Sequence, residues 1–263
     1  MWKLINNFYM TTPLKHTRTI LFIFLVFYFH NAHAAVQDKQ KELQDRIYNS
    51  FVEGNLNSWE LTITEMENLY RTNPRPDFLY DLLLARYGFI AANLGEGEKS
   101  KARAHLDKAE EELERLFVYT IHKSNAYALQ GAFLGFRISL RPLSAIRLGP
   151  RSYRAIDNAL EADENNPAAW MEKGNTRFYT PSTFGGSKEE ARDAYKKAVE
   201  LFEKNLQNNQ RWLYLNSLIG LAKSYQYTDQ NALAIATFEK ALRFEPGLTW
   251  VRDELLPEAR SRR

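Results

Sequence analysis

Cysteine is absent from all 263 residues of this chain. This excludes disulfide bonds, cysteine-ligated zinc, iron–sulfur clusters and thiol nucleophiles together, so a metal or catalytic site would depend on histidine and carboxylate side chains. Histidine is also scarce, with five in the chain. Hydrophobic residues make up 44% and charged residues 25% of the sequence, which is typical of a globular protein and can supply a core.

Acidic residues are absent from positions 1–34, which carry three basic residues and the apolar run Ile20–Phe29 and end in Ala32-His33-Ala34. These are the parts of a secretory signal peptide. We predict a signal peptide over residues 1–34, cleaved between Ala34 and Ala35, and a periplasmic or secreted mature protein that does not span the membrane. A retained anchor is the less favoured interpretation, because a spanning helix needs roughly 20 apolar residues.

Net charge also disappears once the leader is removed. The leader holds three of the 35 basic residues, which leaves 32 basic and 32 acidic residues in a mature chain of 229 residues. A neutral chain lacks the basic patch that nucleic-acid binding normally needs. Translation from Met10 is an alternative start, because residues 1–9 make the basic segment unusually long.

Residues suited to catalysis are few in the mature chain. His105 and His122 are its two histidines, and neither has a serine, cysteine or HExxH-type partner in the sequence. Runs of glutamate such as Glu110-Glu111-Glu112 are typical of the solvated face of an amphipathic helix. We therefore expect no enzyme activity, no cofactor, no metal and no nucleic-acid partner.

Strand-like alternation of useful length is absent, whereas apolar residues recur at three- and four-residue spacing throughout the mature chain. Asn-Pro, Gly and Ser residues separate the periodic segments. The pattern predicts an all-α protein with helices over residues 36–53, 57–71, 77–94, 98–121, 124–141, 150–164, 167–179, 187–206, 211–228, 231–244 and 248–259.

Two of the last predicted helices carry a repeat signature. Small and aromatic residues share a face of each: Leu218, Leu221, Ala222 and Tyr225 on the first, and Ala234, Phe238 and Ala241 on the second, with Pro246 closing the unit. They resemble the tetratricopeptide repeat (TPR) at each of its eight signature positions, with the spacing of a 34-residue repeat. One such repeat cannot bury its apolar face alone, so neighbouring repeats must stack.

Divergent copies precede this unit. Trp170 and Gly174 resemble signature residues of a first helix, and Ala191, Tyr195 and Ala198 resemble those of a second helix. The most regular repeat covers residues 215–248, and divergent repeats cover residues 36–74, 77–121, 124–167 and 168–206. The resemblance implies a single domain over residues 35–263, a right-handed TPR-like helical solenoid of about five helix pairs with a C-terminal capping helix.

The first helix of each pair in a TPR solenoid lines a concave groove, where its non-signature positions meet ligands. The resemblance therefore implies a protein or peptide partner. It also implies these groove residues: Asp81, Phe89, Asn175, Phe178, Tyr179, Lys223 and Tyr227. An error of one residue in the repeat register would turn each side chain by about 100° around its helix.

The segment from Pro181 to Ser187 is an unusual connection with the sequence Pro-x-x-Phe-Gly-Gly-Ser. Its glycines permit positive φ, and Ser187 with Glu190 has the form of a capping box for the helix that follows. A similar turn occurs in divergent periplasmic and organellar solenoids of this repeat class. One interpretation is an extended turn with Phe184 in the core, and the other is a functional loop.

Five arginines, Arg137, Arg141, Arg147, Arg151 and Arg154, lie within eighteen residues. Gly149-Pro150 is predicted to open the helix that bears the last two, so free backbone N–H groups would lie beside them. We hypothesise that Arg141, Arg147 and Arg151 bind an acidic peptide or a phosphorylated ligand. The alternative is pairing with acidic neighbours such as Asp157, Glu161 and Asp163 on a solvated face.

The combined features favour a non-catalytic binding or assembly module of the periplasm or cell envelope, with a protein or peptide held in the concave groove. Two alternatives remain open. An accessory subunit of a periplasmic small-molecule transport system would contain a large apolar tunnel. A structural envelope component would tolerate substitution of the groove residues.

Overall fold

The computed structural model describes residues 14–262, with side chains from residue 34 onward. The start of the predicted leader and Met10 lie outside the described residues. Within the described range there is no β-strand, as the sequence pattern predicts. None of the helices searched in this range combines the length and the apolarity of a membrane span.

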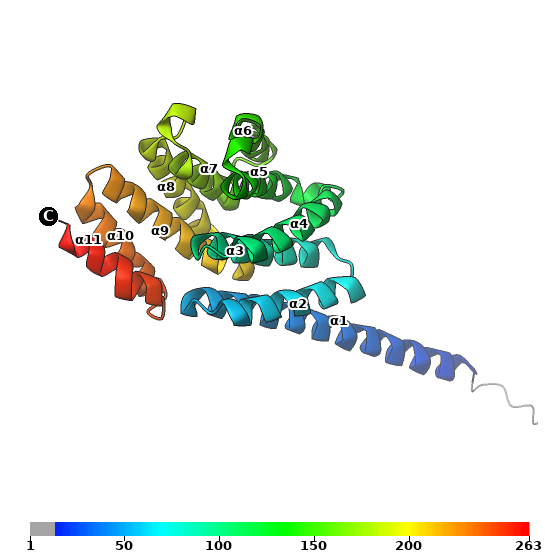
Figure 1. The fold of residues 1–263 in the computed structure, drawn as a ribbon. Helices are drawn as coiled ribbons and strands as arrows, with labels where there is room; N and C mark the ends of the chain where they lie inside the picture. Colours follow the sequence, from blue (N-terminus) through cyan, green and yellow to red (C-terminus); the bar gives the residue numbers. More distant parts are fainter. Residues whose placement is uncertain (1–13, 263) are drawn as a thin grey trace, which may run out of the picture. The chain divides into compact units, whose positions relative to one another are not determined.

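Helices follow one another along the chain, joined mostly by short turns (Figure 1). They are α1 (Leu14–Glu53), α2 (Leu56–Thr72), α3 (Pro76–Gly95), α4 (Lys99–Leu116), α5 (Lys123–Leu140), α6 (Ala145–Ala162), α7 (Pro167–Tyr179), α8 (Lys188–Lys204), α9 (Arg211–Tyr227), α10 (Asn231–Phe244) and α11 (Leu256–Ser261). A π-helical turn, Val251–Leu255, precedes α11. The bounds of α2, α3, α5 and α7 to α10 match the predicted helices closely, whereas α4 ends at Leu116 rather than at residue 121.

Helix α1 begins at Leu14, before the predicted start at residue 36, and the predicted start of α6 is also wrong. Helix α6 begins at Ala145 rather than at Pro150, because Pro142 opens a 3₁₀ turn that leads directly into it. Pro150 therefore lies inside the helix and leaves the carbonyl of Ile146 without its usual partner. The side chain of Ile146 is exposed at this point. No free helix N-terminus lies at Gly149-Pro150.

The chain divides into two compact units, residues 1–40 and residues 41–263, and helix α1 runs through both. In the second unit the helices pack as hairpins, α3 on α4, α5 on α6, α7 on α8 and α9 on α10. The first helices of successive hairpins also touch, α3 with α5, α5 with α7 and α7 with α9. This stacking of hairpins is the arrangement that the repeat signature predicts.

Close approach between hairpins depends on two glycines that face the same aromatic ring. A Cβ atom added to Gly174 on α7 would lie 2.7 Å from the ring of Tyr195, and one added to Gly220 on α9 would lie 2.5 Å from it. Tyr195 itself, on α8, is buried. Glycine at both positions therefore lets one tyrosine fill the space between consecutive repeats.

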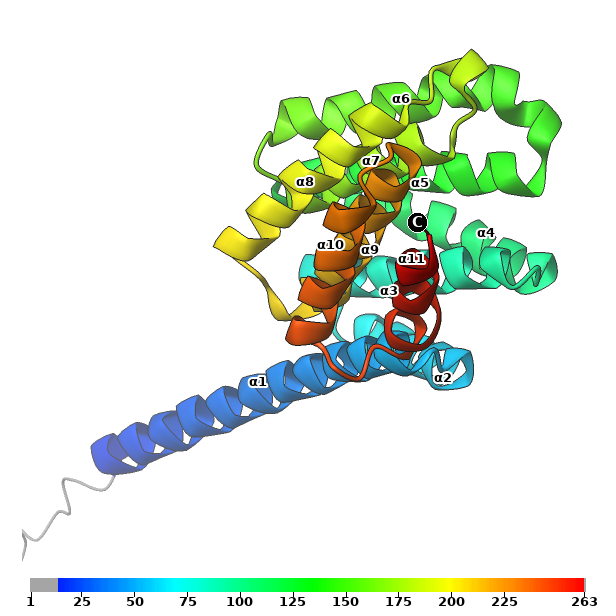
Figure 2. The same cartoon turned by 90° about the vertical axis from the view of Figure 1, so that its left-hand side faces the viewer.

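The last hairpin also meets the first, a contact that the sequence does not predict. Trp212 on α9 lies 5.6 Å from Trp59 on α2, centroid to centroid, and 5.9 Å from Tyr87 on α3. The hydroxyl of Tyr48 on α1 donates to Glu245, after α10, at 2.6 Å. Figures 1 and 2 both show the C-terminal helices returning beside the end of α1. The array therefore closes into a ring.

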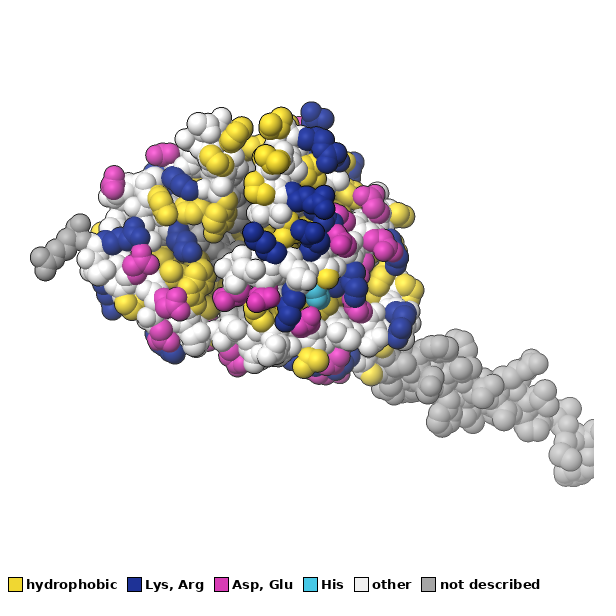
Figure 3. Space-filling view, in the orientation of Figure 1, with side chains coloured by type: hydrophobic (Ala, Val, Ile, Leu, Met, Phe, Trp, Pro, Cys, Tyr) yellow, Lys and Arg dark blue, Asp and Glu magenta, His cyan; other side chains and the backbone are white. Residues whose placement is uncertain are grey.

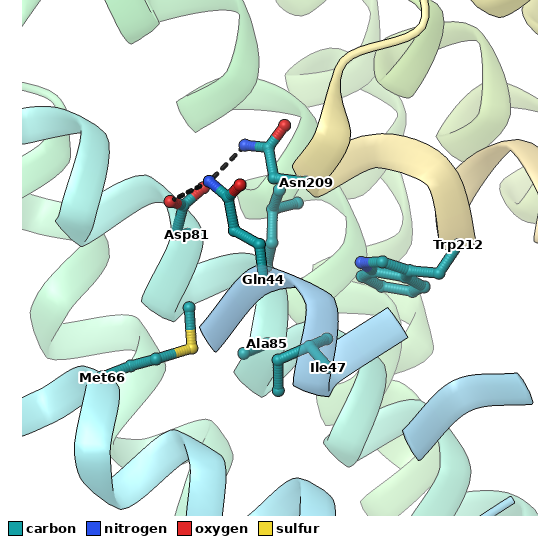
Figure 4. A pocket seen from close by; sticks show the side chains of 8 residues that line it. Gln44, Ile47, Met66, Asp81, Ala85, Asn209 and Trp212 are labelled. Atoms are coloured by element: carbon teal, nitrogen blue, oxygen red, sulfur yellow. Dashed lines mark hydrogen bonds between the residues drawn. The ribbon is translucent and has the colours of Figure 1, made fainter. Parts of the chain in front are cut away.

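Closure fills the space that an open solenoid would leave as a groove. Helix α3 is buried on nearly all sides, from Phe78 to Ile90. A small cavity of about 10 Å³ remains between α1, α3 and α9 (Figure 4), lined by Gln44, Ile47, Met66, Asp81, Leu84, Ala85, Asn209 and Trp212. A second, of similar size, lies between α3, α5, α7 and α9. Such volumes hold about one water molecule and no larger ligand.

A buried ion cluster fixes α3 to its two neighbours. Arg86 is completely buried and donates to both carboxylate oxygens of Glu112 on α4, at 2.7 and 2.9 Å, and to Glu67 on α2. Its third nitrogen lies 3.2 Å from the imidazole of His105. Each nitrogen of the guanidinium thus has a polar partner, which is the condition under which a buried charge is tolerated.

Candidate binding surface

Large aromatic side chains remain exposed at the C-terminal ends of α7 and α9, in the turn after α7, and before the π-helical turn near the C-terminus. We call Tyr179, Phe184, Tyr227 and Trp250 the aromatic surface; they are 71%, 61%, 61% and 42% exposed. In Figure 3, hydrophobic side chains gather over α7 and α9 beside a shallow hollow, with basic side chains on its other side. An exposed apolar patch of this kind in a well-buried fold indicates an interaction surface.

Both ends of helix α7 are set by the local sequence. The side chain of Asn166 accepts from the N–H groups of Ala168 and Ala169, at 2.9 and 3.3 Å, and caps the N-terminus. Thr180 precedes Pro181 and therefore takes an extended conformation, which stops the helix after Tyr179. Tyr179 is thus the last helical residue and points outward, while Phe178 is buried.

Phe178 forms the base on which the exposed tyrosines rest. Its ring centroid lies 5.0 Å from that of Tyr179 and 5.3 Å from that of Tyr227, both edge to face. Lys188, on α8, places its ammonium 3.7 Å from the Phe178 centroid and 4.9 Å from the Tyr227 centroid. Burial lowers the pKa of Lys188. The four side chains make a platform with an aromatic rim and a cation at its centre.

The connection after α7 holds Phe184 outward. Gly185 adopts φ of +89°, and a Cβ atom on Gly186 would lie 1.8 Å from the carbonyl oxygen of Thr180. Arg177 donates to the carbonyl of Gly185 at 2.7 Å. Both glycines are therefore required by the turn. The interpretation that Phe184 packs in the core is wrong, because the turn leaves its ring exposed.

Ser187 caps the following helix as predicted. Its hydroxyl accepts from the backbone N–H of Glu190 at 3.1 Å. The Glu190 carboxylate lies 3.0 Å from Arg177 instead of returning to the cap. The start of α8 is thus tied to the end of α7, which holds the loop between them in one conformation.

Helix α9 and the C-terminal cap extend the aromatic surface. Lys223 lies one turn before Tyr227, and its ammonium sits 4.4 Å from the ring centroid of Trp250. Burial lowers the pKa of Lys223, and attraction to Glu258 opposes part of that change. Trp250 is partly exposed beside this lysine.

Asn175 has a structural role beneath this surface. It donates to Glu172 at 2.9 Å and to the hydroxyl of Tyr87 at 3.1 Å, and it accepts from the hydroxyl of Tyr195 at 2.6 Å. Burial raises the pKa of Glu172 to about 7, and hydrogen bonds from Tyr87 and Asn175 offset part of the increase. Sequence reasoning missed Glu172, although a lone glutamate on the apolar face of α7 was a signal.

Two further predicted groove residues are buried away from the aromatic surface. Asp81 accepts from Gln44 at 2.8 Å and from Asn209 at 2.6 Å (Figure 4), which ties α3 to the two ends of the array. Phe89 packs 4.5 Å from His105 between α3 and α4. Both side chains are almost completely buried, so neither is presented to a ligand.

The predicted arginine cluster divides into a paired residue and several without ion pairs. Arg137 donates to Glu110 at 2.8 and 2.6 Å and contacts Asp107, both on α4. Arg141, Arg147 and Arg151 are exposed and form no ion pair with any described residue. Pairing with Asp157, Glu161 or Asp163, which was the alternative, is not seen.

Neither histidine belongs to a catalytic grouping among the described residues. His122 stacks on Tyr80 at 5.0 Å and lies 3.4 Å from Asp77. Burial, and to a smaller extent Arg86, lowers the pKa of His105. No set of three His, Asp or Glu side chains in the described part of the chain could hold a metal ion. The arrangement supports binding through aromatic and cationic side chains.

Comparisons with known proteins give the fold. No protein-family model matches the chain, and no curated protein matches its sequence. The HusA haemophore from Porphyromonas gingivalis matches 71% of this chain and 93% of its own, with a TM-score of 0.60 and 19% identity. TTC0263, a thermophilic TPR protein of Thermus thermophilus, matches 82% of this chain and 98% of its own, with a TM-score of 0.51 and 17% identity.

Proposed function

Because the chain has the TPR-like helical-repeat fold of these solved structures, we propose that it is an exported, non-catalytic binding module of the periplasm or cell envelope. Its ligand is a protein or peptide, held on the aromatic surface where α7 and α9 end. In the described part of the chain, most residues of α3 and α9 are buried by the closure of the array, so the contact is made at this outer end.

The observation that carries this proposal is the exposure of Tyr179, Phe184 and Tyr227 on a rigid base. Tyrosine and phenylalanine side chains supply large contact areas at low conformational entropy cost, and they recur among the residues that dominate binding energy. The ammonium of Lys188 lies over the ring of Phe178, beside Tyr227, and favours a ligand with acidic groups. No comparable group of aromatic side chains is exposed elsewhere in the described residues.

A photoreactive side chain tests where the ligand binds. Benzoylphenylalanine in place of Phe184 is expected to form an adduct with one partner in cells, whereas the same residue in place of Leu61, exposed on α2, is expected to form none. Tyr179→Ala with Tyr227→Ala should reduce the adduct at position 184 by tenfold or more. Equal adducts at both positions would contradict the proposal.

Export is tested on the same protein. The mature N-terminus should be Ala35 when the chain is recovered from the envelope fraction, because cleavage follows the A-x-A sequence. Substitution Ala34→Lys should block processing and leave the precursor in the membrane fraction. Recovery of the unprocessed chain from the cytoplasm of wild-type cells would contradict export.

A second candidate is a carrier of a planar, anionic small molecule. It is favoured by the exposed tyrosines Tyr179 and Tyr227, with Lys188 beside the ring of Tyr227, and by the resemblance in fold to a protein named a haemophore. Haem is the direct probe. A saturable change in the haem absorption spectrum that Tyr179→Ala and Tyr227→Ala abolish would support this candidate, and the absence of saturable binding would remove it.

A further inference from the structure

The turn between α5 and α6 carries two large aliphatic side chains with almost no covering. Leu143 is 97% exposed and Ile146 is 81% exposed, more than any other large hydrophobic side chain of the described residues. Pro142 fixes the 3₁₀ turn that projects them. Both side chains expose apolar surface to water, and burying that surface against another molecule would be favourable in free energy. Neither side chain contributes to the core, so fold stability does not explain them.

Exposed arginines precede and follow these aliphatic side chains in the sequence. Arg147, Arg151 and Arg154 follow at intervals of four and three residues, which places them along one stripe of α6, and Arg141 precedes the turn. All four are exposed and form no ion pair with a described residue. Like charges at these intervals repel one another and destabilise a helix by a few tenths of a kcal/mol per pair. In Figure 3, basic side chains gather with hydrophobic ones over α5 and α6.

The order of charge along α6 also opposes helix stability. A helix favours negative charge at its N-terminus and positive charge at its C-terminus. Helix α6 has Arg147 in its first turn and Glu161 in its last turn, and no acidic residue in its first turn. These arginines oppose the helix macrodipole and have no ion-pair partners in the chain. We infer that they bind a negatively charged surface of another molecule.

We propose that this end of α5–α6 docks on an anionic phospholipid bilayer. The surface, called the basic tip below, consists of Arg141, Leu143, Ile146, Arg147, Arg151 and Arg154. Leu143 and Ile146 enter the boundary between headgroups and acyl chains, and the guanidiniums contact lipid phosphates. A bilayer fits better than an acidic protein, because two aliphatic side chains on a projecting turn need no complementary pocket there. This proposal is independent of the ligand of the aromatic surface.

Vesicle flotation tests the proposal with the full chain. Wild-type protein should float with vesicles of phosphatidylcholine and phosphatidylglycerol and much less with pure phosphatidylcholine. Any contribution of the leader is common to all variants, so the readout is the difference between the two lipid mixtures. Arg147→Gln with Arg151→Gln should reduce that difference, with about a fivefold loss of partitioning per arginine.

Matched variants separate the two parts of the basic tip. Leu143→Ser with Ile146→Ser should also reduce flotation, by about tenfold, because apolar burial is lost while charge is kept. Controls are Arg103→Gln with Lys196→Gln, which remove two exposed charges elsewhere, and Leu61→Ser on α2. These controls should float like the wild type. Tip variants that float like the controls would overturn the proposal.

Insertion itself is measured on a chain that has no cysteine of its own. Leu143→Cys and the control Leu61→Cys are each labelled with an environment-sensitive fluorophore. Emission from position 143 should shift to shorter wavelength with anionic vesicles, and emission from position 61 should not. Binding of wild-type protein to polyglutamate, together with no flotation on anionic vesicles, would overturn the proposal and assign the surface to an acidic protein.

Discussion

Arg86 on α3 and the arginines of the basic tip carry the same charge in opposite surroundings. Arg86 is completely buried and shares its donors between Glu67 and Glu112. The tip arginines are exposed and lack ion pairs. A buried charge is tolerated only with such partners. The difference therefore separates a charge that holds helices together from charges available to a second molecule.

Removal of Arg86 should give the largest effect. Arg86→Ala leaves the partly buried Glu112 carboxylate without its cation and leaves Glu67 with Lys108 alone, so we expect a loss of about 3–5 kcal/mol in the free energy of unfolding. Urea denaturation at neutral pH measures it. Arg86→Met combined with Glu112→Met should recover part of the loss, because no unpaired charge remains at that position. Wild-type stability in Arg86→Ala would contradict a structural role.

Glu172 sharpens the comparison, because it is a buried carboxyl without a cation. Burial raises its pKa to about 7 from an ordinary value of 4.5. The folded state therefore holds a proton that the unfolded state has lost, and this contribution to stability declines as pH rises from about 4.5 to 7. Glu172→Gln should raise the free energy of unfolding by about 3 kcal/mol at pH 8.

At pH 4 the same variant should match the wild type, since both side chains are then uncharged. Urea denaturation at the two pH values makes the comparison. Glu200→Gln, at an exposed position on α8, provides a matched control. An equal effect of Glu172→Gln at both pH values would show that Glu172 does not titrate in this range.

Neutralisation at the basic tip should have the smallest effect on stability. Arg147→Gln with Arg151→Gln should change the free energy of unfolding by no more than about 0.5 kcal/mol, and in the stabilising direction, because repulsion along α6 is relieved. Thermal denaturation measures this. A destabilisation approaching that of Arg86→Ala would mean that the tip arginines serve the fold.

Much of the fold could be predicted from sequence because its determinants are local. The spacing of Gly174, Tyr195 and Gly220 encodes the contact between consecutive hairpins, and the structure brings these three together. Closure of the ring could not be predicted, since Trp212 and Trp59 are far apart in sequence and no periodicity relates them. Because this contact was not predicted, the inner faces of α3, α5, α7 and α9 were expected to line an open groove.

The candidate site was predicted only in part for the same reason. Tyr179 and Tyr227 lie at helix ends, where local register decides exposure, and both are exposed. Asp81 faces the closing contact and is therefore buried, which only the tertiary arrangement determines. Lys188 was missed because its neighbours come from two other helices.

A reversible lock on the ring tests most directly whether ligands bind at its outer end. A Cβ atom on Gly247 would lie 3.2 Å from Cγ1 of Val52, so Val52→Cys with Gly247→Cys should form a disulfide between the two ends of the array. Benzoylphenylalanine at position 184 then reports ligand binding from an envelope extract. The oxidised and reduced forms should give the same adduct yield within about twofold, which corresponds to a difference in binding free energy below about 0.5 kcal/mol. An adduct that disappears on oxidation and returns on reduction would show that ligands enter through an opening of the ring instead.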